Sequence, residues 1–490
     1  MRSAGILMHI SSLPSPYGIG TMGKAARQFA QFLQRAGQHY WQILPIGQTG
    51  FGNSPYQCCS TCAGNPYLID LDLLIEDRLL LEQEVRAIDW ENHAERVDYE
   101  FQGSVRFGLL RRAFQRGADR YEREISDFRR ENPWVEDYAL FLAVRESRGG
   151  ESWEHWPEEL RLRRRGVKES YATVLAEEMN FYIFVQFLFD RQWHDLRAYV
   201  HSLGIEIIGD LPIYVPYDSC DVWANPELFQ LDAQGRPTAV AGCPPDYFSE
   251  DGQLWGNPLY DWDKMRQDGY RWWMERIRSA AKLFDVIRID HFRGLESYWS
   301  VPAGEETARN GKWVKGPDHD FTAAISRNFP QLRLIAEDLG FLTPEVIRLQ
   351  RDSGYPGMKV LEFAFVPYEP SSYLPHNYER NCICYSGTHD NETLGQWLAS
   401  LNEETAAYVA EYLGVRTREE CHWGVLRAGM ASVADTFIAQ MQDYLELGAE
   451  ARMNEPGTVG AENWSWRVDE TMLTDALADK IARLTRMYER

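Results

Sequence analysis

An arginine and an aspartate lie two positions apart in the segment from residue 285 to residue 294, which is otherwise rich in β-branched residues. A strand places Arg288 and Asp290 on the same side, where two charges are costly unless they meet each other or a polar ligand. The arginine holds the carboxylate ionised, and an ionised, positioned aspartate is the nucleophile that attack at a sugar carbon requires. A structural ion pair at the end of a strand is the alternative that this segment leaves open.

Two later segments also end in acids. Residues 332–340 form a short apolar run that closes on Glu337, and residues 381–391 form another that closes on Asp390. Asp210 likewise ends the run 206–212. Successive strands that run out in acids, with glycine close to each, are typical of an active site built on the C-terminal ends of barrel strands.

Eight strand-like runs, with helical stretches between most of them, would position these acids. Eight strand–helix units predict an α/β protein with a (β/α)8 TIM barrel. The runs occupy residues 4–10, 40–46, 206–212, 285–294, 332–340, 358–365, 381–391 and 437–443, and helical periodicity spans 25–36, 103–116 and 171–199.

The chain is much longer than a plain barrel. Such a barrel needs about 250 residues, whereas this chain has 490. We therefore expect a single catalytic barrel over residues 1–490, with large and mainly helical insertions after strands two, three and four. The insertions are expected as a helical subdomain at 51–200, a segment with a cleft-covering loop at 212–275, and a segment at 295–330.

The order of the strands also predicts how the acids lie. One barrel unit separates Asp290 from Glu337, so the two acids should sit on adjacent strands. Adjacent strands lie about 4.8 Å apart, which is close to the carboxyl separation of about 5–5.5 Å in retaining glycosidases.

Composition narrows the possible partners. The net charge of −22 argues against nucleic acid or an anionic membrane as a partner, and the 17 Trp, 25 Tyr and 22 Phe would suit a sugar-binding cleft. We identify no signal peptide and no run of about 18 apolar residues, so we expect a cytoplasmic protein with eight free cysteines. Cys58, Cys59 and Cys62 lack the companions of a zinc site, so no metal is expected.

These motifs, taken in order, resemble the 4-α-glucanotransferases, also called amylomaltases or disproportionating enzymes, of glycoside hydrolase family 77. The resemblance runs nearly from end to end and is weakest at about residues 70–200. It is carried by the segments at 11–14, 18–20, 41–45, 54–57, 64–66, 209–214, 244–249, 255–258, 288–294, 336–340, 388–391, 452–454 and 463–467.

The resemblance implies a role for particular residues. It places the nucleophile at Asp290, the general acid/base at Glu337, and the carboxylate that grips the ring hydroxyls of the donor sugar at Asp390. It implies no cofactor and no metal. The substrate-binding residues that it implies are Tyr56, Asp210, Asp246, Trp255, Asn257, Arg288, His291, His389 and Asn454.

The activity that the resemblance implies is transfer of an α-1,4-glucan segment to the 4-OH of glucose or of another α-1,4-glucan. The route would be a retaining double displacement with a covalent glycosyl-enzyme on Asp290. Maltooligosaccharides and α-1,4-glucans would be the partners of a monomer or small homo-oligomer. We expect Glu337 to hold its proton near neutral pH because Asp338 and Asp290 crowd it.

Three other interpretations remain open from the sequence. A hydrolase or a branching enzyme on the same barrel would keep the three acids and change the acceptor. A metal-dependent barrel would use the same acids as cation ligands and would lose activity to chelators. A non-catalytic glucan-binding protein would need the aromatic residues but not Glu337.

Overall fold

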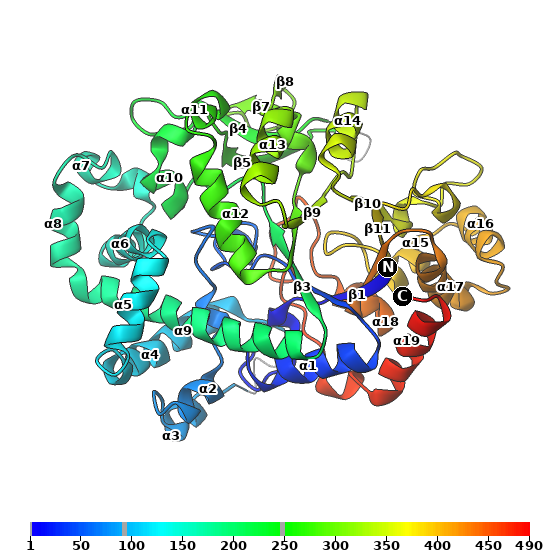
Figure 1. Ribbon diagram of the computed structural model, residues 1–490, viewed down its shortest axis with the longest axis horizontal. Helices are drawn as coiled ribbons and strands as arrows, with labels where there is room; N and C mark the ends of the chain where they lie inside the picture. Colours follow the sequence, from blue (N-terminus) through cyan, green and yellow to red (C-terminus); the bar gives the residue numbers. More distant parts are fainter. Residues whose placement is uncertain (1, 91–95, 246–249) are drawn as a thin grey trace.

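Eight parallel strands form the centre of the molecule, which we describe from a computed structural model over residues 2–90, 96–245 and 250–490 (Figure 1). The strands follow one another in the order β10-β11-β12-β1-β2-β3-β6-β9, and the N–H of Ala336 in β9 donates to the carbonyl of Pro356, just before β10, at 2.9 Å. The sheet is thus nearly closed, and the predicted (β/α)8 barrel is confirmed. Its strands are β1 (Ser3–Leu7), β2 (Tyr40–Gln42), β3 (Glu206–Leu211), β6 (Val286–Ile289), β9 (Arg333–Ala336), β10 (Gly357–Val360), β11 (Cys382–Tyr385) and β12 (Thr436–Gln440).

The barrel strands are short and almost entirely buried. All residues of β6, β11 and β12 are buried, as expected for parallel strands that are covered on both faces. Each of the eight predicted runs contains or overlaps one strand, and the runs extend past the strands at their C-terminal ends. The extra residues form the loops that carry the acids.

The first and the last barrel strands meet along one seam. β1 pairs with β12 from Ser3 opposite Thr436 to Leu7 opposite Gln440, and it pairs with β2 on its other side. Gly5 permits the second contact, because a Cβ there would lie 2.6 Å from the Cβ of Tyr40. Arg490 donates to the carbonyl of Ser3 at 2.9 Å, so the two ends of the chain lie together (Figure 1).

Helices surround the barrel and fill the first insertion. The segment after β2 holds α2 to α9, and the long α9 leads from this insertion back along the barrel to β3 (Figure 1). The predicted helix at 103–116 lies within α4, whereas the one at 171–199 is divided at Leu175 into α8 and α9. The helices are α1 (Lys24–Arg35), α2 (Leu71–Glu76), α3 (Glu82–Arg86), α4 (Tyr99–Gly117), α5 (Glu122–Glu131), α6 (Trp134–Ser147), α7 (Glu158–Arg161), α8 (Val167–Val174), α9 (Ala176–Ser202), α10 (Cys220–Ala224), α11 (Trp262–Gln267), α12 (Arg271–Leu283), α13 (Asp318–Asn328), α14 (Pro344–Ser353), α15 (Leu394–Ser400), α16 (Glu403–Leu413), α17 (Arg418–Ala431), α18 (Met441–Tyr444) and α19 (Asp475–Met487).

A second, smaller sheet joins the other two insertions. Its strands are β4 (Ala239–Cys243) and β5 (Gln253–Pro258) from the segment after β3, and β7 (Ser297–Pro302) and β8 (Lys312–Lys315) from the segment after β6. They pair antiparallel in the order β5-β4-β7-β8. The sequence analysis did not predict this sheet, and these two insertions are therefore less helical than expected.

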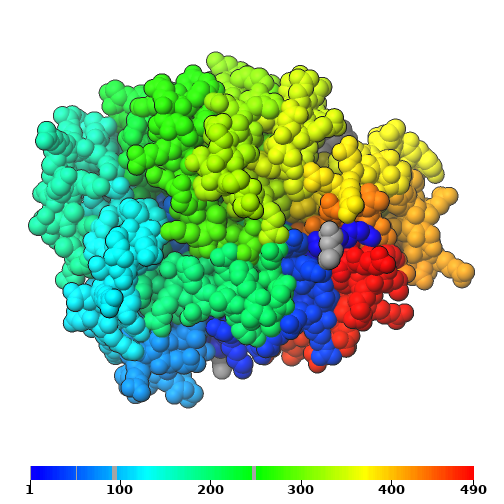
Figure 2. All heavy atoms as spheres, viewed as in Figure 1, coloured from blue at the N-terminus to red at the C-terminus, as the bar shows by residue number. Residues whose placement is uncertain are grey.

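The molecule is elongated, with the first insertion at one end (Figure 2). The insertion helices, in cyan and teal, gather there, and residues 400–490, in orange and red, form the other end. Within the described residues, none of the helices combines the length and the apolar character that a membrane-spanning segment needs.

Candidate active site

Arg288 joins two aspartates at the C-terminal end of the barrel. Its Nη1 lies 2.8 and 2.7 Å from the two carboxylate oxygens of Asp210, and 3.1 Å from Oδ1 of Asp290. The side chains of Arg288 and Asp210 are almost fully buried, whereas that of Asp290 is 28% exposed. The predicted contact of Arg288 with Asp290 is confirmed, and Asp290 is the member of this network that a ligand can reach.

Backbone N–H groups hold Glu337 beside this network. Glu337 follows β9, the neighbour of β6, and its Oε2 accepts from the N–H of His291 at 2.7 Å. Its Oε1 accepts from the N–H of Leu339 at 3.0 Å. His291 has a positive φ of 48°, and in this uncommon conformation it turns its N–H toward the next strand. The carboxyl group of Glu337 is thus fixed by two donors.

The loop after β11 supplies the third acid. Oδ1 of Asp390 accepts from Nδ2 of Asn454 at 2.7 Å, and Oδ2 lies 3.3 Å from Nε2 of His389. Burial alone would raise the pKa of Asp390, but the charge and hydrogen bond of His389 and the hydrogen bond of Asn454 lower it to about 2. Asp390 is therefore ionised near neutral pH, and 45% of its side chain is exposed.

Asp290 and Glu337 carry one proton between them near neutral pH. Burial raises the pKa of Glu337 to about 7, and the charge of Asp290 contributes to this; burial, with the charges of Asp210 and Asp390, raises the pKa of Asp290 to about 6. The contact with Arg288 favours the ionised form of Asp290. Near neutral pH the proton is therefore favoured on Glu337 and the negative charge on Asp290.

The cause that we expected for the raised pKa of Glu337 is partly wrong. Burial is the largest cause and Asp290 adds to it, whereas Asp338 does not crowd Glu337. The Asp338 carboxylate instead accepts from the N–H of Met358 in β10 at 2.6 Å. Two adjacent residues at a strand end project to opposite sides, so Asp338 faces β10 rather than the cleft.

Aromatic rings line the cleft beside the acids. The Tyr56 hydroxyl donates to Oδ2 of Asp210 at 2.6 Å, and its ring stacks on His389 with centroids 5.1 Å apart. Trp255 in β5 meets the His291 ring edge-on at 4.8 Å. These contacts bring the predicted residues Tyr56, His389, His291 and Trp255 to one site.

Two further residues were predicted to bind the substrate, Asn257 and Asp246. Asn257 is buried in β5, two positions after Trp255. Asp246 lies outside the described residues. The predicted role of Asp246 in substrate binding therefore stays a prediction.

Sequence reasoning missed several groups at this site. Nη2 of Arg452 donates to the backbone carbonyl of Asp390 at 3.1 Å, and the ring of Trp464 lies 5.8 Å from the rings of both Tyr56 and His389. Both residues stand in segments that carried the family resemblance, and that was the available signal. The backbone N–H groups of His291 and Leu339 could not be identified from the types of residue in the sequence.

The cysteines do not form a metal site. All eight are free thiols, and burial raises the pKa of Cys58 and Cys59 to about 12 and that of Cys62 to about 11. Among residues 2–90, 96–245 and 250–490, no three His, Cys, Asp or Glu side chains are grouped to hold a metal ion.

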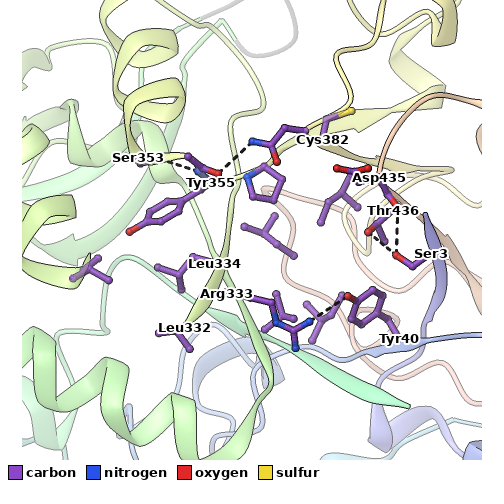
Figure 3. A pocket seen from close by; sticks show the side chains of 18 of the residues that line it. Ser3, Tyr40, Leu332, Arg333, Leu334, Ser353, Tyr355, Cys382, Asp435 and Thr436 are labelled. Carbon is purple, nitrogen blue, oxygen red and sulfur yellow. Dashed lines mark hydrogen bonds between the residues drawn. The ribbon is translucent and has the colours of Figure 1, made fainter. Parts of the chain in front are cut away.

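A cavity of about 590 Å³ lies at the opposite end of the barrel (Figure 3). Residues at the beginnings of the strands contribute to its lining, and several of their polar groups bind one another. The hydroxyl groups of Ser3 and Thr436 lie 2.9 Å apart, and Nη1 of Arg333 lies 3.4 Å from the Tyr40 hydroxyl. The cavity contains none of the predicted site residues, so the acids and not the volume mark the candidate site.

Comparisons with known proteins identify the family of this chain. The family model for 4-alpha-glucanotransferase matches residues 8–473. A 4-alpha-glucanotransferase of Clostridium butyricum is 46% identical over 486 residues, which cover 99% of this chain and 100% of that protein. One of Thermus thermophilus is 47% identical over 479 residues and 95% of each chain. The solved structure of amylomaltase from Streptococcus agalactiae in complex with acarbose is similar over 100% of both chains, with 40% identity and a TM-score of 0.98. The chain therefore belongs to the 4-alpha-glucanotransferase family, glycoside hydrolase family 77, whose members are transferase enzymes.

Proposed function

We propose that this enzyme transfers a segment of an α-1,4-glucan to the 4-OH of glucose or of another α-1,4-glucan, by a retaining double displacement. The observation that carries the proposal is the pair of acids on neighbouring strands. Asp290 is held ionised by Arg288, while the pKa of Glu337 is raised to about 7. A nucleophile beside a protonated acid is the arrangement that such a displacement needs.

In the first step the Asp290 carboxylate attacks the anomeric carbon of the donor sugar. The bond from that carbon to the glycosidic oxygen breaks, and the oxygen takes the proton of Glu337 as the leaving chain departs. The product is a glycosyl ester on Asp290. The two backbone donors on Glu337 hold its carboxyl group in place, and they stabilise the carboxylate that the step creates.

In the second step the Glu337 carboxylate takes the proton of an incoming hydroxyl group. The hydroxyl oxygen attacks the anomeric carbon, the ester bond to Asp290 breaks, and the configuration of the donor is retained. Asp390 binds ring hydroxyls of the donor sugar. Because its pKa is about 2, it is fully charged while positive charge develops on the flattening ring.

The identity of the acceptor decides between transfer and hydrolysis. Water gives hydrolysis, and the 4-OH of a glucan gives transfer. Trp255 and the other aromatic side chains around His291 and Tyr56 support an acceptor sugar and exclude water from the ester. Maltooligosaccharides and α-1,4-glucans are thus the proposed substrates. The eight free thiols are consistent with a proposed location in the cytoplasm.

Incubation with maltotriose alone tests this function. Transfer should yield glucose together with a ladder of maltooligosaccharides longer than the donor, resolved by anion-exchange chromatography. Glucose and maltose without longer products would show a hydrolase instead. A preparation of Asp290→Asn purified in parallel serves as the control for contaminating enzymes.

A further inference from the structure

Two carboxyl groups flank the strand that carries Asp390, one fully buried and one half-buried. β11 lies between β10 and β12 in the barrel sheet. Glu362 follows β10, in a short 3-10 helix at Leu361–Phe363, and Asp443 follows β12, in α18. Asp443 is fully buried, with an exposed fraction of 0%. The double displacement assigns no role to either acid.

Asp443 connects the two ends of the Asp390 loop. Its Oδ2 accepts from the hydroxyl group of Ser386 at 2.6 Å, and its Oδ1 accepts from the N–H of Leu394 at 2.8 Å. Ser386 is the first residue after β11, and Leu394 is the first residue of α15. One carboxylate therefore ties together both ends of the segment 387–393, which contains His389 and Asp390.

Glu362 lies under the start of the same segment. A Cβ on Gly387 would be only 2.5 Å from Oε1 of Glu362, so the backbone rests directly on that carboxyl group. Among the described residues, this Oε1 is buried and has no hydrogen-bond partner. Burial raises the pKa of Glu362 well above its usual range, and the nearby charge of Asp443 raises it further.

The two acids differ in the hydrogen bonds that reach their carboxyl groups. Burial also raises the pKa of Asp443, but the hydrogen bonds from Ser386 and Leu394 oppose this, and its pKa is about 6. Burial thus favours the protonated form of Glu362, whereas the two hydrogen bonds favour the ionised form of Asp443. An ionised acceptor makes stronger hydrogen bonds than a neutral one, which suits a group that holds a loop in place.

We propose that Asp443 is a positioning residue for glucan transfer, because it joins the two ends of the segment 387–393 and thereby holds Asp390 against the ring hydroxyls of the donor sugar. The inference rests on the proposed function, since it requires Asp390 to bind the donor. Asp443 touches no substrate and acts only through the loop. A misplacement of about 1 Å in an active site can cost about 100-fold in rate.

The chain offers a matched control for a merely structural acid. Asp70 is also buried, and it accepts from the Thr21 hydroxyl at 2.6 Å and from the N–H of Leu73 at 3.0 Å. Like Asp443, it thus pairs one hydroxyl with one N–H at the start of a helix, here α2 in the first insertion. Neither of these two hydrogen bonds involves the segment 387–393.

The test compares Asp443→Ala, Asp443→Asn and Asp70→Ala by steady-state kinetics on maltotriose, with the folded fraction measured by circular dichroism. Asp443→Ala should lower kcat by roughly 10- to 100-fold per folded molecule. Asp443→Asn should recover most of it, because the amide oxygen can accept from Leu394 and the amide N–H can donate to Ser386. Asp70→Ala should lower the melting temperature but keep kcat within about twofold.

A double-mutant cycle separates positioning from a general loss of structure. With α-maltosyl fluoride as the donor, Asp390→Asn should lower turnover by about 100-fold or more. Asp443→Ala should then add less than about threefold in that background, because the group that it positions is already lost. A full additional loss would overturn the inference. If Asp443→Ala does not fold, Ser386→Ala, which removes one of the two hydrogen bonds, replaces it in the cycle.

The two proposals fail in different ways. Normal kcat in Asp443→Ala, together with the expected loss in Asp390→Asn, would overturn the positioning role and leave the proposed function standing. Normal turnover in Asp390→Asn would instead remove the role of Asp390 in the proposed function. An equal fall of kcat in Asp70→Ala would show that the loss of any buried acid that holds a loop lowers kcat. The effect would then not be specific to Asp443, and the positioning role would fall.

Discussion

The two ends of the barrel both contain charged groups and space, but they use their polar groups differently. At the C-terminal end, Asp290 and Asp390 remain partly exposed, and burial raises the pKa of Glu337. At the N-terminal end, the charged groups that line the cavity are paired: Arg333 donates to both carboxylate oxygens of Glu206 at 2.9 and 2.7 Å, and Arg380 donates to Asp435 at 2.8 Å. Chemistry therefore follows from partly paired acids and not from the size of a cavity.

The largest effect should come from the nucleophile at the C-terminal end. Asp290→Asn keeps the shape of the side chain but cannot form the ester, so kcat should fall by about 10⁴-fold or more. Binding of maltooligosaccharides, measured by calorimetry, should survive because Arg288 still has Asp210 as a partner. Near-normal product formation by a clean preparation would show that another group is the nucleophile.

The general acid should give the next largest effect, and one that depends on the donor. Glu337→Gln should lower transfer from natural glucans by about 10²- to 10⁴-fold, because the leaving sugar then departs without a proton. An α-glucosyl fluoride needs no such proton, so the first step should proceed and a glycosyl-enzyme should accumulate.

The trapped intermediate makes that prediction specific. Mass spectrometry should locate one added glucosyl unit on the peptide that contains Asp290. Azide, which needs no deprotonation, should release the sugar with retained α configuration. A β product would indicate a single inverting displacement and would contradict the double displacement.

The pH profile should show a smaller and graded effect at the same end. Activity needs Asp290 ionised and Glu337 protonated, and burial raises their pKa values to about 6 and about 7. Below about pH 6, kcat/KM should fall about tenfold per pH unit as Asp290 gains a proton; above about pH 7 it should fall likewise as Glu337 loses its proton. Asp390 adds no limb in this range because its pKa is about 2. A profile that is flat from pH 5 to pH 9 would contradict this assignment.

The smallest effect should come from the N-terminal end. Arg333→Ala breaks the pair with Glu206, but both side chains are more than 40% exposed, so the free energy of unfolding should fall by less than about 1 kcal/mol. Steady-state kinetics should give an unchanged kcat, and urea unfolding should give the stability. A tenfold loss of kcat would assign a function to the cavity and remove the contrast between the two ends.

The barrel could be predicted because each of its strands can be recognised from a few consecutive residues. Each barrel strand is a compact apolar run, and β6 with Arg288 and Asp290 shows how a strand end fixes two side chains at once. The four-stranded sheet escaped prediction because β4, with sequence Ala-Val-Ala-Gly-Cys, and β8, with two lysines in four residues, lack a strand pattern. They form strands through pairing with their neighbours: β8 pairs with β7, and β4 pairs with β5 and with β7, which belongs to a different insertion.

The site, like the fold, was predicted only in part. Acids at strand ends could be found from position alone, and Asp443 after β12 obeys the same rule as Asp390 after β11. The direction in which an acid faces could not be found, and for that reason Asp338 was wrongly placed against Glu337. Backbone donors such as the N–H of His291 depend on a φ value that the residue type does not predict.

The seam between β1 and β12 has a consequence for the synthesis of the protein. β1 finds its partner only after β12 has left the ribosome, roughly 430 residues later, which at about 5–20 residues per second takes on the order of 20 to 90 seconds. During that interval one edge of β1 has no partner strand from this chain, and an unpaired apolar edge invites association with other chains. Slow translation or a shortage of chaperones should therefore lower the yield of this enzyme through its first strand, far from any residue that takes part in catalysis.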